Sequence, residues 1–590
     1  MKNKKYGVFT FTGRVVAMYC KASKWYGLLE QTLAVIHGFS WAVGIIATQI
    51  LFDAVTDAGA GELGFWQVVG PLAVLAAVTI GQQILNGAEN FTQSVVEEKN
   101  MGTYMAILQR KLQRIPAKSF EDTAFLDNVN KAVEGSDGLG ILAFVFLQFF
   151  TFYCVFFVAV GVYLFWLSPM LPLVILASFV PALLGQIAHI KIFSKLEEEN
   201  APQRRRYEYF QKAIVDREFY KETRILGAFR YFKGLFSESL MIVTRKTWQT
   251  ERKAAIVRLL LNLASFAGLG ASLYMLFTAT MAGDISVGAF AAVFTSLSLI
   301  FGIMDEIVTG HFGVASEYIG KVINYFRVMD MDEVKGEKGK LDFSKGIVAD
   351  NISFTYPGRD TAAISNVSLA IAQGETIAIV GENGAGKSTF VRLLMGIFHS
   401  DGGTVKIGGL DSATTHPNSI FNGVSSVFQQ YQRYKMTLRD NVEISDMSSS
   451  ATGKIHDILK KADFNEDGLE LDSMLSPEFD GIDLSGGQWQ RLAIARGLYR
   501  DNGFIVLDEP TAAIDPIEET RIYNQFKNLA AGKCAIVVTH RLGSAKLADR
   551  IVVMDSGAII DSGTHEELLS RAGKYAQMWT AQAAWYENRE

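Results

Sequence analysis

The sequence predicts a multidomain chain in which an all-α, polytopic membrane domain of six transmembrane helices with long cytoplasmic extensions precedes an α/β domain. Three observations support this fold class. With 590 residues the chain is too long for one hydrophobic core. Hydrophobic residues make up 49% of it and 40 residues are phenylalanine, more than a soluble chain with 20% charged residues normally contains. The apolar stretches end before a glycine-rich loop that begins at Gly381.

Six long apolar stretches lie in the first half of the chain. They cover residues of about 28–52, 66–88, 140–165, 168–190, 257–280 and 285–308. Each reaches the roughly 20 residues that a helix needs to cross the hydrocarbon of a lipid bilayer. One such stretch would also suit a buried helix of a soluble core, but six in succession predict a membrane domain over residues 1–330.

The charged connections between the stretches predict their orientation, because lysine and arginine are retained on the cytoplasmic side. The N-terminal tail carries Lys2 and Arg14 among other cations, whereas residues 53–63 have acids and no cation. The later connections over about 89–138 and 191–256 are again rich in lysine and arginine. We therefore expect both termini in the cytoplasm and the protein in the cell inner (plasma) membrane.

After the sixth stretch the residue pattern changes. A charged, glycine-containing segment over residues 331–345 is typical of a linker. From residue 346 to residue 590, short β-rich runs alternate with helical patterns, which predicts an α/β domain.

The segment TIAIVGENGAGKSTFVRLLMG has the order strand, glycine turn, helix that a phosphate-binding loop requires. The glycines let the backbone wrap with its N–H groups pointing inward, and the helix adds its positive end. Lys387 is expected to reach the β- and γ-phosphate oxygens, and Ser388 to hold Mg²⁺. The predicted nucleotide-binding residues of this loop are Gly381, Glu382, Asn383, Gly384, Ala385, Gly386, Lys387, Ser388 and Thr389.

Two further strands carry polar residues at their ends. The run GFIVLDEP predicts a strand buried on both faces that delivers Asp508 beside the phosphate loop as a second Mg²⁺ ligand. Glu509 is then placed to orient and deprotonate an attacking water. The run AIVVTH ends at His540, which could touch the γ-phosphate, although a histidine after a strand is usually structural.

A second phosphate-binding turn lies about a hundred residues after the first. LSGGQWQRLAIARGLYR begins with a polar glycine turn and continues as an amphipathic helix, so its amides and the Ser485 hydroxyl form an anion site. One nucleotide cannot easily occupy both turns of one chain. A second copy, rotated head to tail, could close this turn over the γ-phosphate held by the first copy, and ATP would then join a symmetric dimer.

These motifs resemble those of the ATP-binding cassette (ABC) transporters, specifically exporter-type half-transporters with one membrane domain and one nucleotide-binding domain. The resemblance covers essentially the whole chain. It implies a Walker A motif in GENGAGKST, a Walker B motif in FIVLDE and the family signature in LSGGQ. By the same resemblance, Tyr356 stacks on adenine, Gln429 is the Q-loop residue that senses Mg²⁺, and Asp515 and His540 are the D-loop and switch residues. The signature residues expected to contact nucleotide are Ser485, Gly486, Gly487 and Gln488.

The resemblance also implies an activity. An enzyme of this kind hydrolyses ATP with Mg²⁺ as cofactor and uses the energy to move a peptide, lipid or hydrophobic small molecule out of the cytoplasm. A homodimer is expected because every catalytic motif is present, and a heterodimer with a degenerate partner stays open. Residues 119–129 and 217–229 resemble the coupling helices that dock on nucleotide-binding domains, one of them reaching the partner subunit. The cassette looks most like those of bacterial exporters of lantibiotic peptides.

Two alternatives stay open on the sequence alone. One is an importer of a siderophore-like metal chelate with the same fold, and the other is an ATP-gated channel or regulatory subunit. The net charge of −5 argues against a nucleic-acid partner. The spans show neither a run of cations for an anionic lipid nor a patterned row of acids for a cationic drug, and Asp305 and Glu306 suit solvent exposure as well as a substrate role.

Overall fold

The structure is a computed structural model that describes most of the chain. It covers residues 7–447, 452–465, 468–500, 502–509, 521, 524, 526–527 and 530–587, without the side chains of residues 194, 198 and 585–587. The chain forms two compact units, Met1–Leu112 with Asn128–Asp330 and Gln113–Asp127 with Met331–Glu590. A short segment from the predicted membrane domain, residues 113–127, therefore packs within the second unit.

All secondary structure described in the first unit is helical. Its elements are α1 (Val8–Ser23), α2 (Trp25–Gly59), α3 (Phe65–Leu112), α4 (Thr123–Gln148), η2 (Phe149–Tyr153), α5 (Cys154–Leu167), α6 (Leu171–Val215), α7 (Tyr220–Ile225), α8 (Phe229–Ala282), α9 (Val287–Asp305), η3 (Glu306–His311) and α10 (Phe312–Met329). Both η2 and η3 are π-helical turns that continue the neighbouring α-helices.

Six helical stretches are long and apolar enough to cross a membrane. They are Trp25–Gly59, Phe65–Leu112, Thr123–Leu167, Leu171–Glu197, Phe229–Ala282 and Val287–Met329. Each overlaps one of the six apolar stretches found in the sequence, which confirms the membrane part of the predicted fold class. At 1.5 Å per residue, α3 with 48 residues and α8 with 54 are far longer than a ~30 Å hydrocarbon layer, so the predicted extensions are also present.

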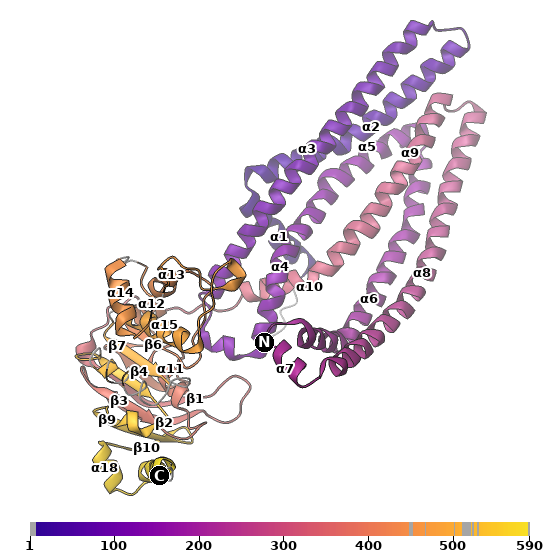
Figure 1. Ribbon diagram of the computed structural model, residues 1–590. Helices are drawn as coiled ribbons and strands as arrows, with labels where there is room; N and C mark the ends of the chain where they lie inside the picture. Colours follow the sequence, from indigo (N-terminus) through magenta and orange to yellow (C-terminus); the bar gives the residue numbers. More distant parts are fainter. Residues whose placement is uncertain are drawn as a thin grey trace. The chain divides into compact units, whose positions relative to one another are not determined.

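Inside the first unit, α6 packs along α8 as a long pair, and α2 packs against α3, α5 and α9 (Figure 1). The buried core contains Phe156 and Leu164 of α5 together with Val293 of α9. Many large apolar side chains lie outside this core, among them Trp66 at 81% and Trp166 at 85% exposure. Such outward-facing apolar surface is expected of helices that contact lipid.

The second unit contains two sheets. The first is antiparallel in the order β2-β1-β4-β5, with β1 (Ile347–Phe354), β2 (Ile364–Ile371), β4 (Gly402–Ile407) and β5 (Leu410–Asp411). The second has the order β10-β9-β3-β8-β7-β6, with β3 (Thr376–Val380), β6 (Val424–Val427), β7 (Phe504–Asp508), β8 (Cys534–Val538), β9 (Arg550–Asp555) and β10 (Ala558–Gly563). All pairings in the second sheet are parallel except that of β9 with β10.

Short helices surround these sheets. They are η1 (Ala117–Glu121), η4 (Phe343–Lys345), α11 (Lys387–Leu394), α12 (Pro417–Phe421), α13 (Leu438–Glu443), α14 (Thr452–Lys461), η5 (Pro477–Phe479), α15 (Gly486–Tyr499), α17 (Leu542–Ala545), α18 (His565–Ser570) and α19 (Lys574–Glu587). Every residue of β3, β7 and β8 is buried, as expected of apolar strands in a parallel sheet that is covered on both faces. The predicted α/β fold of this unit is therefore confirmed.

The carboxyl ends of parallel strands meet at one edge of a sheet, where α/β proteins place their ligands. Here the phosphate loop follows β3, Glu509 directly follows β7, and His540 lies two residues after β8. This topology places polar residues that are up to 158 positions apart in the chain, Glu382 and His540, at one edge of the parallel sheet.

Candidate functional site

The phosphate loop connects β3 to α11, and its shape depends on glycine. Gly384 and Gly386 have φ values of +85° and +93°, a region that glycine adopts without the strain other residues meet. Gly386 immediately precedes α11, so free backbone N–H groups of the first helical turn lie at the loop. An anion is stabilised at such a helix start by these N–H groups and by the helix dipole.

Gly386 and Gly384 offer a matched test of this loop. A Cβ at Gly386 would lie 2.7 Å from the carbonyl oxygen of Ala363, whereas a Cβ at Gly384 would meet no heavy atom within 4 Å. We expect Gly386→Ala to destabilise the protein by about 2–4 kcal/mol, from backbone strain and the clash together. Gly384→Ala should lower the free energy of unfolding by about 1 kcal/mol, because it adds backbone strain without a clash. Thermal unfolding of the two purified variants measures the difference, and equal melting temperatures would contradict this conformation of the loop.

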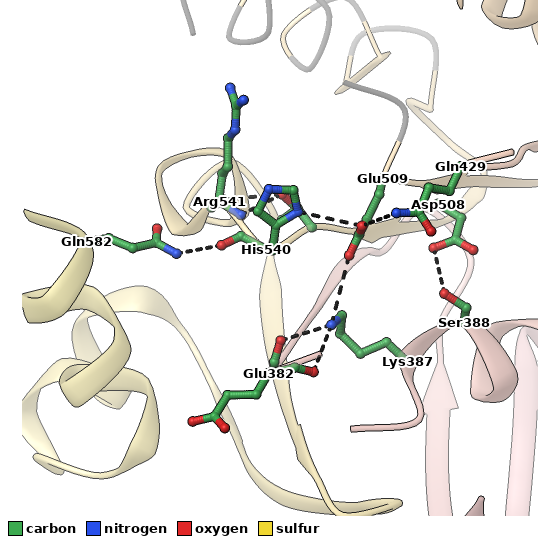
Figure 2. Close-up of polar contacts among 11 residues, drawn as sticks. Glu382, Lys387, Ser388, Gln429, Asp508, Glu509, His540, Arg541 and Gln582 are labelled. Carbon is green, nitrogen blue, oxygen red and sulfur yellow. Dashed lines mark hydrogen bonds and ion pairs between the residues drawn. The ribbon is translucent and has the colours of Figure 1, made fainter. Parts of the chain in front are cut away.

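The lysine and serine at the start of α11 point into the site. Lys387 is buried and donates through Nζ to the carbonyl oxygens of Gly381 at 2.9 Å and Glu382 at 3.1 Å. Ser388 donates through Oγ to Oδ1 of Asp508 at 3.2 Å. The structure thus brings together the three residues that the sequence places around the phosphates and the metal ion (Figure 2).

Asp508 lies at the buried end of β7 and is 4% exposed. Burial raises its pKa above the ordinary value, although the hydrogen bond from Ser388 acts in the opposite direction. A buried carboxylate beside a hydroxyl is a suitable pair of oxygen ligands for Mg²⁺, which prefers such donors. The positive charge of that ion would offset the burial of Asp508.

Glu509 follows Asp508 and has a φ of +46°, which is unusual for a residue with a side chain. Such backbone strain is frequent at functional sites. Its Oε2 accepts a hydrogen bond from Nε2 of Gln429 at 2.8 Å and lies 3.6 Å from Nδ1 of His540, while its Oε1 is 3.9 Å from Nζ of Lys387 (Figure 2). The contact with His540 is the main cause that lowers the pKa of Glu509, so this side chain is ionised at neutral pH.

Gln429 and His540 reach Glu509 from two other strands. Gln429 lies two residues after β6, and among the described hydrogen bonds its amide binds Glu509 rather than Asp508 or Ser388. The carbonyl oxygen of His540 accepts from Nε2 of Gln582 in α19 at 2.5 Å, which holds the backbone beneath a half-exposed imidazole. The metal-sensing role of Gln429 stays a prediction.

Tyr356 lies in the segment between β1 and β2. Its hydroxyl is 3.0 Å from Oγ1 of Thr389 and accepts from Nη1 of Arg392 at 3.3 Å. Its ring packs edge-on against Phe354 and Phe398. Thr389, the last residue of the predicted loop motif, therefore holds this tyrosine near α11, and adenine stacking on Tyr356 stays a prediction.

The second turn that is predicted to bind an anion caps its own helix. Ser485 accepts from the backbone N–H of Gln488 at 3.3 Å, and Oε1 of Gln488 accepts from the N–H of Ser485 at 2.9 Å, which forms a capping box for α15. Tyr431 donates to the carbonyl oxygen of Gly486 at 3.0 Å. Among the described residues, no hydrogen bond or ion pair joins the Ser485–Gln488 turn to Lys387, Ser388 or Asp508.

The site has two further features, a predicted residue outside the described part of the chain and an ion pair that no sequence pattern predicted. Asp515, the predicted D-loop residue, lies outside the described residues. Glu382 of the phosphate loop forms an ion pair of 2.6 Å with Lys574 at the start of α19. The hydrogen bond and charge of Lys574 lower the pKa of Glu382. No sequence pattern pointed to this pair, because Lys574 lies 192 residues away and outside every motif.

The segment 113–127 lies beside the residues that are predicted to bind Mg²⁺. Nζ of Lys118 is 2.6 Å from Oδ1 of Asp401 and 4.7 Å from the centre of the Phe354 ring. Burial would raise the pKa of Asp401, but hydrogen bonds from Lys118 and from the N–H of Thr355 outweigh it and lower the pKa. This packing involves the first of the two turns that resemble coupling helices.

A cavity of about 360 Å³ lies between this segment and the residues that are predicted to bind Mg²⁺. Ala117 and Glu121 line it from η1, and Ser388, Gln429 and Asp508 line it from the α/β domain. A movement of η1 would therefore change the cavity that the side chains around the expected Mg²⁺ position also line.

Two family descriptions match the chain. Residues 31–304 match the ABC transporter transmembrane region, and residues 364–512 match the ABC transporter domain. The subtilin transport ATP-binding protein SpaT of Bacillus subtilis is 30% identical over 382 residues, which are 63% of this chain and 62% of that protein. The nisin transport ATP-binding protein NisT of Lactococcus lactis subsp. lactis is 27% identical over 63% of each chain.

The matched region spans less than two thirds of the length of these relatives. The ATP-dependent lipid A-core flippase of Escherichia coli (strain K12) is 36% identical over 43% of this chain and 44% of its own. A solved structure of a bacterial Atm1-family ABC exporter with ATP bound has the same fold, with a TM-score of 0.76, 20% identity and coverage of 95% of this chain and 99% of that one. With both family regions fused in one polypeptide, the chain belongs to the ABC transporter family as a half-transporter of the exporter type.

Proposed function

We propose that this protein is an ATP-driven exporter that works as a homodimer in the cell inner (plasma) membrane, with both termini and the α/β domain in the cytoplasm. The observation that carries the proposal is a pair of separate glycine turns on one domain, each at the start of a helix, and we propose that each holds phosphate. Lys387 is buried at the first turn, and the capping box at Ser485 shapes the second. The alternation of cationic and cation-free connections supports the orientation.

The residues of the site have complementary roles in this proposal. The loop amides and Lys387 bind the β- and γ-phosphates, and Tyr356 holds the adenine by stacking. Ser388 and Asp508 bind Mg²⁺, which when present neutralises charge that develops on the phosphates. Glu509 orients the attacking water and accepts its proton, while Gln429 and His540 position the Glu509 carboxylate through the contacts described above.

Two turns, one in each unit, are proposed to pass the state of the nucleotide to the membrane. The first is η1, which packs within the α/β unit through Lys118 and Asp401. The second is α7 with its flanks, where Ile225 is 86% and Leu226 is 68% exposed. Thr223 donates to the carbonyl oxygen of Ala213 at 3.1 Å and so fixes this turn, whose exposed apolar side chains suit docking on the partner subunit.

The proposed transport cycle uses the two phosphate-binding turns and Glu509. Two ATP molecules, each held between the loop of one copy and the signature turn of the other, would draw the α/β domains together and open the membrane domain outward. Hydrolysis, assisted by Glu509, would then release the dimer interface. The names of the relatives mention subtilin, nisin and lipid A-core, and peptides, lipids and hydrophobic small molecules are the cargo classes that we propose.

The test uses the full chain purified alone. In lipid nanodiscs, we expect Mg²⁺-dependent ATP hydrolysis with a turnover on the order of 1–10 s⁻¹, and no hydrolysis when Mg²⁺ is chelated. In proteoliposomes whose α/β domains face the external solution, added ATP should drive a cargo into the lumen. ATP binding without hydrolysis would support a regulatory subunit instead, and ATP-driven movement in the opposite direction would support an importer.

A further inference from the structure

The first unit contains a cavity of about 340 Å³ that the nucleotide chemistry does not use. Glu30 of α2, Glu97 and Asn100 of α3, and Phe144 of α4 line it, together with Glu306 and His311 of η3. Its position is where the apolar part of α3 gives way to charged residues. Glu30 and His311, which are 281 positions apart in the chain, thus line one cavity.

The charge of this cavity is one-sided. Three of its lining residues are glutamates, one is histidine and none is lysine or arginine. Among the described residues, no lysine or arginine forms an ion pair with these three glutamates, and Nε2 of His311 lies 3.9 Å from Oε1 of Glu306. A cavity lined by charges of one sign concentrates ions of the opposite sign.

Asn100 is an independent indication of a ligand. Its side chain lines the cavity and is 1% exposed, yet its Oδ1 has no hydrogen-bond partner in the described part of the chain. Buried acceptors in proteins nearly always have a donor. A ligand that carries N–H groups would supply the missing donor to Asn100 and a positive charge to the glutamates.

The π-helical turn η3 shapes one wall of the cavity. It contributes Glu306, Gly310 and His311, and π-helical turns are rare and frequently mark functional sites. The Nε2 atom of His311 is 2.6 Å from the hydroxyl of Tyr153, which fixes the imidazole ring. Phe144 lies with its ring 5.8 Å from that of His311 and offers an aromatic face to a cation.

We propose that this cavity binds an organic cation through an ammonium or guanidinium group, an inference that rests on the proposed transport function because it names a chemical class of ligand. The carboxylates of Glu97 and Glu306 attract the positive group, and Oδ1 of Asn100 accepts one of its N–H bonds. The volume lies at the lower end of ligand pockets, so it suits one cationic group with a short stem.

Binding to the full chain in nanodiscs tests this site by calorimetry. The free cation is represented by agmatine, with butylurea as its neutral counterpart. A peptide-borne cation is represented by acetylated pentalysine amide, with acetylated pentaglutamine amide as its neutral counterpart. We expect saturable binding of at least one cationic probe, weaker binding of its neutral counterpart, and an affinity that falls as salt is added.

Variants then assign the binding to the cavity. Glu97→Gln and Glu306→Gln should each weaken cation binding about tenfold, because each removes one negative charge from the cavity. Both glutamates are exposed, so the fold should tolerate the substitutions. Glu98→Gln is the matched control, since Glu98 is an exposed neighbour on α3 that does not line the cavity. Its affinity should equal that of the unaltered protein.

Each outcome of these binding experiments either supports or overturns the proposed cation site. Agmatine binding that depends on Glu97 and Glu306 assigns a free organic cation, and binding of pentalysine alone assigns a peptide-borne group. No saturable binding of either cation, or binding that both variants leave unchanged, overturns the cation site. ATP hydrolysis is measured on the same samples, so a protein that hydrolyses ATP but binds no cation contradicts only this inference, whereas one that binds cations without hydrolysis contradicts the proposed pump.

Discussion

Replacing Glu509 by glutamine is expected to lower steady-state ATP hydrolysis by about 10²–10⁴-fold while ATP binding persists. The amide keeps the size of the carboxylate but cannot accept a proton from water. It also replaces the negative charge that lies 3.9 Å from Lys387 and 3.6 Å from His540. Because the nucleotide then remains intact, the variant should also accumulate as the closed dimer in the presence of ATP.

Phosphate release in nanodiscs measures the turnover, and retention of radiolabelled ATP measures binding. Glu566→Gln is the matched control, because Glu566 is an exposed carboxylate on α18, remote in sequence from the catalytic motifs. It should hydrolyse ATP as fast as the unaltered protein. Hydrolysis by Glu509→Gln at a normal rate would rule out the role of Glu509 as the base.

Mixed dimers are expected to show that each ATP site is built from two chains. Lys387→Ala removes the buried cation of the phosphate loop. Gly486→Asp places a carboxylate at the second anion-binding turn, and the fold tolerates it because a Cβ there meets no heavy atom within 4 Å and an acidic side chain suits the first turn of a helix. The added carboxylate repels phosphate, so either change alone should inactivate the sites that it touches.

The two changes can be distributed in two ways. When one copy carries Lys387→Ala and the other Gly486→Asp, a head-to-tail dimer keeps one intact site and should retain about half of the hydrolysis if its sites act independently. When one copy carries both changes and the other none, both shared sites are damaged and activity should be lost. Sites made within single chains would give the opposite pattern, so the phosphate release of the two purified mixed dimers separates the arrangements.

Local patterns in the sequence were sufficient to predict much of this protein. Span length depends on runs of apolar residues, and the phosphate loop depends on a strand, glycines and a helix that are consecutive in the chain. Both the six long helices and the α/β fold are therefore confirmed. Lys387, Ser388 and Asp508 also lie together as expected, because parallel strands deliver their carboxyl ends to one edge.

Tertiary structure alone decided the contacts that join distant segments. The sequence carried no sign that Gln429 would bind Glu509, that Lys574 would pair with Glu382, or that Lys118 would reach Asp401. Such pairs depend on the angles and registers at which helices and strands pack, and no periodicity within one segment encodes them.

The acidic cavity, too, could not be predicted from patterns within one segment of the sequence. Read along the chain, Glu30, Glu97 and Glu306 form no row of acids, and the spans offered no indication of a cationic ligand. Three helical segments bring them together around Asn100. The sequence by itself determined which segments are apolar enough to enter a membrane and which turns suit phosphate, because neighbouring residues decide both. Only the packing of helices against one another decided which polar side chains share a cavity, since that depends on distances between segments far apart in the chain.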